Sequence, residues 1–132
     1  MKPLLSALLV AGAFALPAAH AQSDKPIRIG VLTDLSGMNA DLSGQGSVEA
    51  ARMAVEDFGS TVLGRKIEVI ASDHQNKADI GSATARRWID QDNVKAIVDV
   101  PTSSVALAVQ EITRTSNIAF LASTAGTSDL TG

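Results

Sequence analysis

Residues 95–104 read KAIVDVPTSS, an apolar strand that leads through a polar turn into a helix. The apolar run Ala96-Ile97-Val98, with two β-branched residues, is typical of a strand that is buried on both faces of a parallel sheet. Ser103 then falls in the first turn of the next helix, at the carboxyl end of that strand. Small ligands bind at such strand ends in open α/β sheets, because helix N-termini present free N–H groups and a partial positive charge. The stretch therefore predicts half of a binding cleft.

The same alternation of strand and helix extends in both directions along the chain. Apolar periodicity predicts strands at residues 27–34, 66–73, 95–99 and 118–122, and helices at residues 47–58, 78–91 and 103–116. Residues 35–46 are a long polar loop at the end of the first strand, where loops tend to carry function. Strands that alternate with helices of this length favour right-handed crossovers. We therefore expect an α/β fold, a parallel sheet with helices on both faces.

The first twenty-one residues are predicted to be a secretory leader that is not part of the fold. Lys2 supplies a positive start, residues 4–16 are apolar, and Ala19-His20-Ala21 fits a cleavage site. This apolar run is shorter than the roughly 20 residues that a bilayer span needs. We therefore expect export to the periplasm and a folded unit over residues 22–132. Because the chain ends in a polar turn, we also expect it to be a fragment of a longer protein.

Composition excludes several kinds of site and partner. The sequence has no cysteine, so it can form no disulfide and has no thiol nucleophile. Beyond the leader it has ten basic and fourteen acidic side chains, a net charge of about −4 with no basic cluster, so nucleic acid is not an expected partner. His74 is the only histidine beyond the leader. A histidine-rich metal site is therefore excluded, and we expect neither a metal nor a cofactor.

Two glycine motifs resemble nucleotide-binding loops and fail the full pattern. Gly44-Gln45-Gly46 precedes a helix as a dinucleotide loop does, but Glu49 stands where the third glycine is needed. Residues 59–66, GSTVLGRK, have the glycine spacing of a phosphate loop, lack its Lys-Ser or Lys-Thr, and lead into a strand. We interpret residues 59–66 as a plain connection, and neither motif as a nucleotide site.

Two further residues have both a functional and a structural interpretation. His74 follows Asp73, and a neighbouring carboxylate can tune an imidazole for acid–base chemistry. The chain has no G-x-S-x-G elbow, so we favour a His74 that is solvated or that supports a site from behind. Trp88 can stack on a ligand or pack in the core. It lies on the apolar stripe of its helix, which favours core packing.

Small polar residues follow the third and fourth predicted strands. Ser103 comes after the third strand, and Thr124, Ala125 and Thr127 come after the fourth. Serine and threonine at these places can simply cap helices and turns. However, both strands deliver such residues to the same end of the sheet, and neither turn has a large side chain. A ligand could therefore approach the backbone and accept hydrogen bonds from its N–H groups.

The chain resembles the periplasmic substrate-binding proteins of branched-chain amino-acid type ABC transporters. The resemblance runs from Ile27 to the last residue and is specific only when its short motifs are taken together. These motifs are Thr33-Asp34-Leu35-Ser36-Gly37, residues 46–57 with their alanine-rich helix, Gly64-Arg65-Lys66, Ser72-Asp73, Ser103-Ser104 and residues 125–131.

The resemblance implies two α/β lobes of the type I periplasmic-binding-protein fold that close over a ligand. This chain would supply most of the N-terminal lobe. In relatives that bind amino acids, the serine that matches Ser103 holds the ligand carboxylate. The segment that matches Thr124, Ala125 and Gly126 binds the carboxylate and ammonium, and Thr127 lies beside it. Leu42 stands nearest to the position of an aromatic residue that packs on the ligand.

The resemblance further implies a non-enzymatic receptor that delivers an amino acid, amide or small acid to an ABC permease in the inner membrane. Two other classes stay open at this point. The same two-lobed fold serves as the ligand-sensing domain of receptors and regulators. An exported α/β hydrolase is less favoured, because the elbow motif is missing and one histidine would have to serve as the base.

Overall fold

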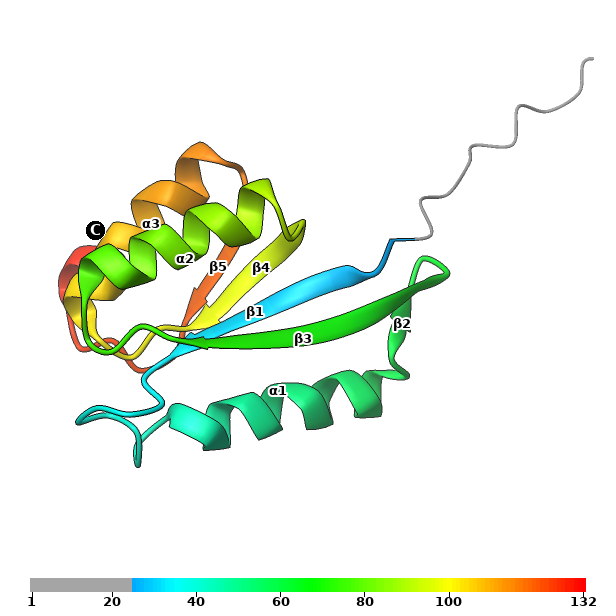
Figure 1. Ribbon diagram of the computed structural model, residues 1–132, viewed down its shortest axis with the longest axis horizontal. Coiled ribbons are helices and arrows are strands. Elements are labelled where there is room, and N and C mark those ends of the chain that lie inside the picture. Colours follow the sequence, from blue (N-terminus) through cyan, green and yellow to red (C-terminus); the bar gives the residue numbers. More distant parts are fainter. Residues whose placement is uncertain (1–24) are drawn as a thin grey trace, which may run out of the picture.

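The computed structural model describes residues 25–132, in which strands and helices alternate along most of the chain (Figure 1). The strands are β1 Ile27–Thr33, β2 Thr61–Val62, β3 Arg65–Asp73, β4 Val94–Asp99 and β5 Ala119–Ala122. The helices are α1 Gly44–Phe58, α2 Ala78–Asp90 and α3 Ser103–Thr115, and a 3-10 turn, η1, spans Ser128–Leu130. The leader predicted at residues 1–21 lies outside the described residues.

Within the described residues the sheet has the strand order β2-β3-β1-β4-β5. Neighbours among β1, β3, β4 and β5 pair in parallel, and β2 pairs antiparallel with the start of β3. Figure 1 shows α1 on one face of the sheet, and α2 and α3 together on the other. The predicted α/β fold, with a parallel sheet and helices on both faces, is confirmed; the short β2 is an antiparallel addition.

The packed core lies between the sheet and the layer formed by α2 and α3. Trp88 is only 2% exposed, which confirms its predicted core position. A Cβ on Gly30 of β1 would lie 2.4 Å from the indole ring, so the glycine makes room for the tryptophan. Burial of each large apolar side chain contributes about 1.5–3 kcal/mol, which holds α2 and α3 on the sheet. The buried core residues are Leu32, Ala85, Trp88, Val94, Ile97, Val100, Val105, Ala106, Val109 and Ile112.

The face under α1 is covered less completely. Ile97 is fully buried on the α2 and α3 side, but Ala96 and Val98 are only half-buried. The expectation that residues 96–98 are buried on both faces is therefore wrong for the α1 face. Phe58, on the predicted apolar stripe of α1, is 67% exposed. The physical reason is that α1 lies alone on this face, whereas two helices cover the other (Figure 1).

The segment predicted as a plain connection, residues 59–66, contains β2 and forms a hairpin with β3. Thr61 pairs with Lys66 and Val62 with Arg65, which leaves Leu63 and Gly64 as a two-residue loop. Both loop residues have positive φ, 50° and 70°, as the tight turns that join twisted strands require. The prediction was wrong because the loop pair Leu-Gly lacks the usual Asn-Gly or Asp-Gly signal.

The ends of α1 show one difference from the prediction and one agreement. The helix begins at Gly44, three residues before the predicted start at Ser47. Gly44 has a φ of 47°, a left-handed conformation that glycine adopts without strain, so the first loop can turn into the helix at this residue. At the other end Gly59 has a φ of 100°, and its N–H donates to Glu56 O at 2.9 Å. Gly59 is the predicted C-cap.

Candidate functional site

The carboxyl ends of the parallel strands meet at one edge of the sheet, which we call the carboxyl edge. Leu32 of β1 is in register with Asp99 of β4, and Asp99 is in register with Ala122 of β5. On the other side of β1, Thr33 is in register with Asp73 of β3. The loops that follow these strands, residues 34–43, 74–77, 100–102 and 123–127, are therefore brought together. Such an edge is where ligands bind in open α/β sheets.

Asp34, directly after β1, is fully buried and organises the first loop. Its carboxylate accepts hydrogen bonds from Gly37 N at 2.8 Å, Asn39 N at 2.9 Å and Asn76 Nδ2 at 2.6 Å. Desolvation alone would raise the pKa of Asp34, but these hydrogen bonds and the nearby His74 lower the pKa below its ordinary value. Asp34 is therefore a charged anchor for the loop, which the sequence analysis did not single out.

A side-chain network joins this loop to the start of α3. Thr102 Oγ1 donates to Asn76 Oδ1. Asn39 Nδ2 contacts both Asn76 Oδ1 and Thr102 Oγ1, each at 3.1 Å. Thr102 directly precedes Ser103, so the network fixes the N-terminus of α3 relative to the loops after β1 and β3. The partners are 26 to 63 residues apart in sequence, and no local pattern signals them.

Asp73, the last residue of β3, holds the same loop from a second point. It accepts hydrogen bonds from Ser36 Oγ at 2.5 Å, Leu35 N at 3.1 Å and Gln75 N at 2.8 Å. Desolvation acts to raise the pKa of Asp73, but these hydrogen bonds and the nearby His74 bring the pKa below its ordinary value. Two carboxylates therefore hold the first loop against the sheet.

His74 is fully buried, so the part of its interpretation that made it solvated is wrong. Its Nδ1 accepts a hydrogen bond from Asn76 N at 3.1 Å, and its backbone N–H donates to Thr33 O at 2.9 Å. Burial lowers the pKa of His74, and the negative charges of Asp34, Asp73 and Asp99 offset only part of that effect. A neutral imidazole with no access to solvent does not favour the hydrolase alternative.

Ser103 is the first residue of α3 and is half-buried. The N-cap position belongs to Thr102, whose side chain makes no capping hydrogen bond. Among the described residues, no hydrogen-bond partner of the Ser103 hydroxyl is found. Helix capping therefore does not account for this serine. Its hydroxyl and the first N–H groups of α3 are available to an acceptor group at the carboxyl edge.

The turn after β5 contains the other predicted residues of this side. Thr124 and Gly126 are exposed, and Ala125 packs partly against the core. Thr127 Oγ1 accepts a hydrogen bond from Asp129 N at 3.3 Å, which is the capping role considered for it. Ala125 and Thr127 also line a groove of about 460 Å³ that extends along β5 toward Gln110 of α3.

Leu42 lies in the first loop with 70% of its surface exposed. Its backbone N–H donates to Asn39 O at 3.0 Å, so the loop that carries it is tied to the network at Thr102. The structure thus places Leu42, Ser103 and the turn after β5 on loops of the same edge. The groove at the turn after β5 is lined by two of the six predicted residues, Ala125 and Thr127, and the role of all six stays a prediction.

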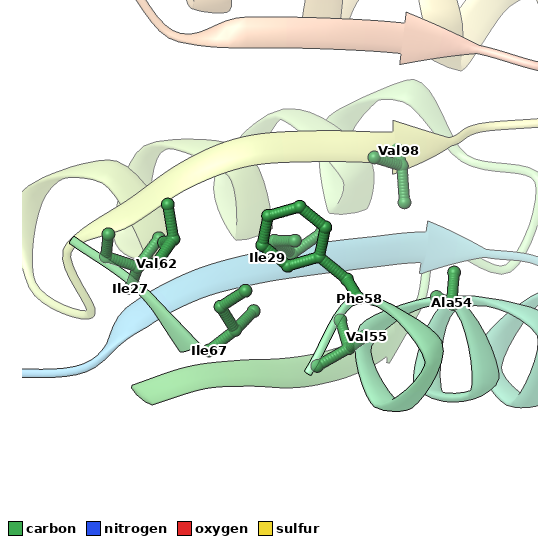
Figure 2. Close-up of a pocket in the computed structure, with 9 residues that line it drawn as sticks. Ile27, Ile29, Ala54, Val55, Phe58, Val62, Ile67 and Val98 are labelled. Carbon is green, nitrogen blue, oxygen red and sulfur yellow. The ribbon is translucent and has the colours of Figure 1, made fainter. Parts of the chain in front are cut away.

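A different hollow lies between α1 and the sheet (Figure 2). This apolar groove has a volume of about 510 Å³ and lies toward the amino ends of the strands. Figure 2 shows the Phe58 ring over Ile29, with Ile27, Ile67 and Val62 beyond it. Its lining offers almost no hydrogen-bonding group. A polar ligand could not be oriented there, so we place the candidate site at the carboxyl edge instead.

Two further findings concern the part of the chain that the structure covers. No group of histidine, aspartate or glutamate side chains among residues 25–132 is arranged to hold a metal ion. In the same range, none of the helices combines the length and the apolar character that crossing a bilayer requires.

Comparisons with known proteins add an independent line of evidence. A family model described as "Periplasmic binding protein" matches residues 26–132. No curated protein matched the chain. Solved structures do match, and the first is a periplasmic binding protein from Burkholderia mallei, 41% identical, with a TM-score of 0.79 over 83% of this chain and 29% of that protein.

Two further structures extend the comparison. A branched chain amino acid ABC transporter periplasmic ligand-binding protein from Burkholderia xenovorans is 38% identical, with a TM-score of 0.74 over 76% of this chain and 27% of that one. A solute binding protein of an ABC transporter from Rhodopseudomonas palustris, in complex with 3,4-dihydroxybenzoic acid, is 26% identical, with a TM-score of 0.72 over 80% and 29%. The chain thus spans less than a third of the length of these proteins.

Proposed function

The chain belongs to the periplasmic binding protein family, and on this premise we propose that it is part of the solute-binding component of an ABC importer. The resemblance to binding proteins of branched-chain amino-acid type transporters is confirmed, and so is the type I fold, of which this chain corresponds to the N-terminal lobe. The protein would bind a small solute reversibly and release it unchanged.

One observation carries the proposal, the Ser103 hydroxyl at the N-terminus of α3. It lies on the carboxyl edge, has no partner among the described residues, and belongs to a helix end fixed by the network at Thr102. A helix N-terminus carries free N–H groups and a partial positive charge. Together these groups favour an anionic oxygen, such as that of a carboxylate.

The ligand class follows from this chemistry and from the relatives. The Burkholderia xenovorans protein is described as belonging to a branched chain amino acid transporter, and the Rhodopseudomonas palustris protein holds an aromatic acid. Both kinds of solute carry a carboxylate. We therefore assign the ligand carboxylate, or the carbonyl oxygen of an amide, to Ser103. The rest of the small amino acid, amide or aromatic acid is assigned to Thr124, Ala125, Gly126, Thr127 and Leu42.

Further parts of the proposal concern the whole protein. Residues 1–21 would direct export and be removed, so that residues 22–132 form the N-terminal lobe in the periplasm. A second lobe would close over the ligand, and the closed form would dock on an ABC permease in the inner membrane. The extra length of the matched structures supports a second lobe, because this chain covers only 29% of the first of them.

The test is calorimetric titration of the protein expressed from its complete gene, with leucine and 3,4-dihydroxybenzoate as separate probes. We expect one of them to bind, and Ser103→Ala to weaken binding about tenfold or more, which corresponds to about 1.4 kcal/mol. Ser104→Ala is the matched control, because Ser104 is the next residue of α3 and is exposed.

Ser104→Ala should leave the dissociation constant within about twofold of the wild-type value, a change well under 1 kcal/mol. Equal effects of the two substitutions, or no effect of Ser103→Ala, would remove Ser103 from the site. Binding of neither probe would restrict the ligand to another chemical class and would contradict the carboxylate assignment.

A further inference from the structure

Among residues 25–132, two buried side-chain atoms have no hydrogen-bond partner, His74 Nε2 and Asp99 Oδ2. His74 is 0% exposed and Asp99 is 4% exposed. Polar groups buried in proteins are almost always hydrogen-bonded, because leaving one unpaired destabilises the fold. Two such atoms near the same edge of the sheet therefore call for a common explanation.

The two atoms have complementary chemistry. His74 Nδ1 accepts a hydrogen bond from Asn76 N at 3.1 Å, so Nδ1 carries a lone pair. The proton of a neutral imidazole must then be on Nε2, which makes Nε2–H a donor without an acceptor. Asp99 Oδ2 is an acceptor without a donor.

The fold places the two side chains at the ends of the two strands that flank β1. Asp99 is in register with Leu32, and Asp73, which precedes His74, is in register with Thr33. Both side chains lie on the α2 and α3 face of the sheet. Asp99 follows the buried Ile97 by two residues on its strand, and His74 Cβ lies 3.7 Å from where a Cβ on Gly81 of α2 would be. The charge of Asp99 also acts on the imidazole.

The other oxygen of Asp99 holds the turn after β5. Ser123 Oγ donates to Asp99 Oδ1 at 2.6 Å, and Ser123 N donates to Asp99 O at 3.1 Å. Ser123 directly precedes Thr124. Asp99 and Val100 have φ values of 79° and 55°, a left-handed conformation that a β-branched residue adopts only when its surroundings enforce it. The chain thus accepts backbone strain at the point where Asp99 reaches the turn.

We propose that His74 Nε2–H donates a hydrogen bond to one enclosed water that in turn donates to Asp99 Oδ2, and that this link positions the Thr124–Thr127 turn. His74 and Asp99 are then positioning residues, which act on a ligand only through Ser123 and the turn. The link itself is independent of ligand binding. Its effect on affinity rests on the proposed function.

The link is tested by NMR on the protein expressed from its complete gene and labelled with 15N-histidine. The His74 signals are those that disappear in His74→Gln. We expect the proton on Nε2, and at least tenfold faster solvent exchange of that proton in Asp99→Asn, because the asparagine can direct an NH2 group at the water. Asp90→Asn, an exposed change on α2, should leave this exchange unchanged.

A proton on Nδ1, or unchanged Nε2–H exchange in Asp99→Asn, would overturn the proposal. We expect a cross-peak between Nε2–H and water in the wild-type protein, and its absence would also overturn the proposal.

The positioning role is tested by amide hydrogen exchange at residues 123–127. His74→Asn places no donor where Nε2 lies and should speed exchange there about tenfold, whereas His74→Gln offers an NH2 group at that distance and should restore protection. Ser123→Ala should speed amide exchange in the turn without changing exchange of the His74 Nε2–H proton. This variant tests the positioning role if the His74 variants fail to fold. Unchanged turn exchange in both His74→Asn and Ser123→Ala would overturn the positioning role.

Titration of the same variants with leucine or 3,4-dihydroxybenzoate separates this inference from the proposed function. If the wild-type protein binds neither probe while the NMR results are as expected, the proposed ligand class fails and the link stands. If a probe binds, His74→Asn should weaken its affinity several-fold and His74→Gln should not.

Discussion

Thr102 Oγ1 donates a hydrogen bond to Asn76 Oδ1, which ties the residue before α3 to the loop after β3. Asn76 also donates from Nδ2 to the buried carboxylate of Asp34. One amide side chain thus joins three of the loops at the carboxyl edge. The position of the α3 N-terminus, where Ser103 lies, depends on residues far from it in sequence.

Replacing Asn76 tests this connection. Asn76 has a φ of 55°, so Asn76→Gly removes the side chain without adding backbone strain. We expect a loss of about 1–3 kcal/mol in the free energy of unfolding, because Thr102 and Asp34 lose a buried partner. Urea denaturation measures this loss in the free energy of unfolding. Gln75→Gly is the matched control, because Gln75 has a φ of 52° and an exposed side chain. A loss as large in Gln75→Gly would trace the effect to the backbone instead.

The lowered pKa of His74 predicts how stability depends on mild acid. Below its ordinary pKa of 6.5 the unfolded chain takes up a proton at this position while the buried, neutral imidazole of the folded chain does not. The unfolded state then binds more protons, so stability should fall as the pH drops below about 6.5. The groups that face the imidazole are Asp34, Asp73 and Asp99, which reduce the effect without cancelling it.

The urea midpoint measured between pH 7.5 and about pH 5 should therefore decline, and the decline should be weaker in His74→Gln, which cannot titrate. Ser104→Ala is the control, since it is an exposed change that removes no titrating group. Identical slopes in wild type and His74→Gln would show that the imidazole is already accessible to protons in the folded state.

Asp34 changes stability in the same direction as His74, but in a lower pH range. Its pKa in the folded chain is below the ordinary value of 3.8, so its charge contributes stability that is present above pH 3.8 and is lost as the pH falls below it. Asp34→Asn should lower stability at pH 7 by about 1.5–3 kcal/mol and make the acid-induced loss below pH 4 shallower. Denaturation at pH 7 and pH 3 checks both, with the exposed Asp41→Asn as control. An unchanged acid limb would contradict the role of Asp34.

Two glycine substitutions compare a filled space with an open one. In Gly30→Ala the new Cβ would lie 2.4 Å from the Trp88 ring, and we expect a loss of about 1–3 kcal/mol from overpacking. In Gly46→Ala nothing lies within 4 Å of the new Cβ, and alanine in a helix should raise stability by about 0.5–1 kcal/mol. Thermal unfolding followed by circular dichroism measures the stability change of each variant. Equal effects would mean that helix α2 shifts to accommodate the methyl group.

The sequence predicted the elements whose periodicity is local. Strand β4 and helix α3 begin within one residue of expectation, because an apolar run and a helical stripe are visible in a short window. The hairpin at Leu63 and Gly64 was missed because its loop lacks the common turn pair. The incomplete cover under α1 could not be predicted either, since periodicity shows which face is apolar and not how many helices cover it.

The candidate site could be predicted only in part. Small polar residues after two strands pointed to the carboxyl edge, and Ser103 lies there with an unpaired hydroxyl among the described residues. The residues that fix the edge, Asp34, Asn76 and Asp99, were not identified, because their side-chain partners are 24 to 42 residues away. An acidic residue at the end of β1, β3 and β4 was the available signal. His74 was misplaced because adjacency to Asp73 suggested a solvent-facing pair.

The groove beside α1 has a thermodynamic consequence. Its apolar walls are already hydrated in the folded chain, so unfolding transfers less new hydrocarbon surface to water than it would in a lobe of equal length with both faces sealed. The heat capacity increment of unfolding, about 12–15 cal/mol/K per residue in ordinary domains, should accordingly be low. A small increment flattens the dependence of stability on temperature, and the chain should resist cold better than its modest core would suggest.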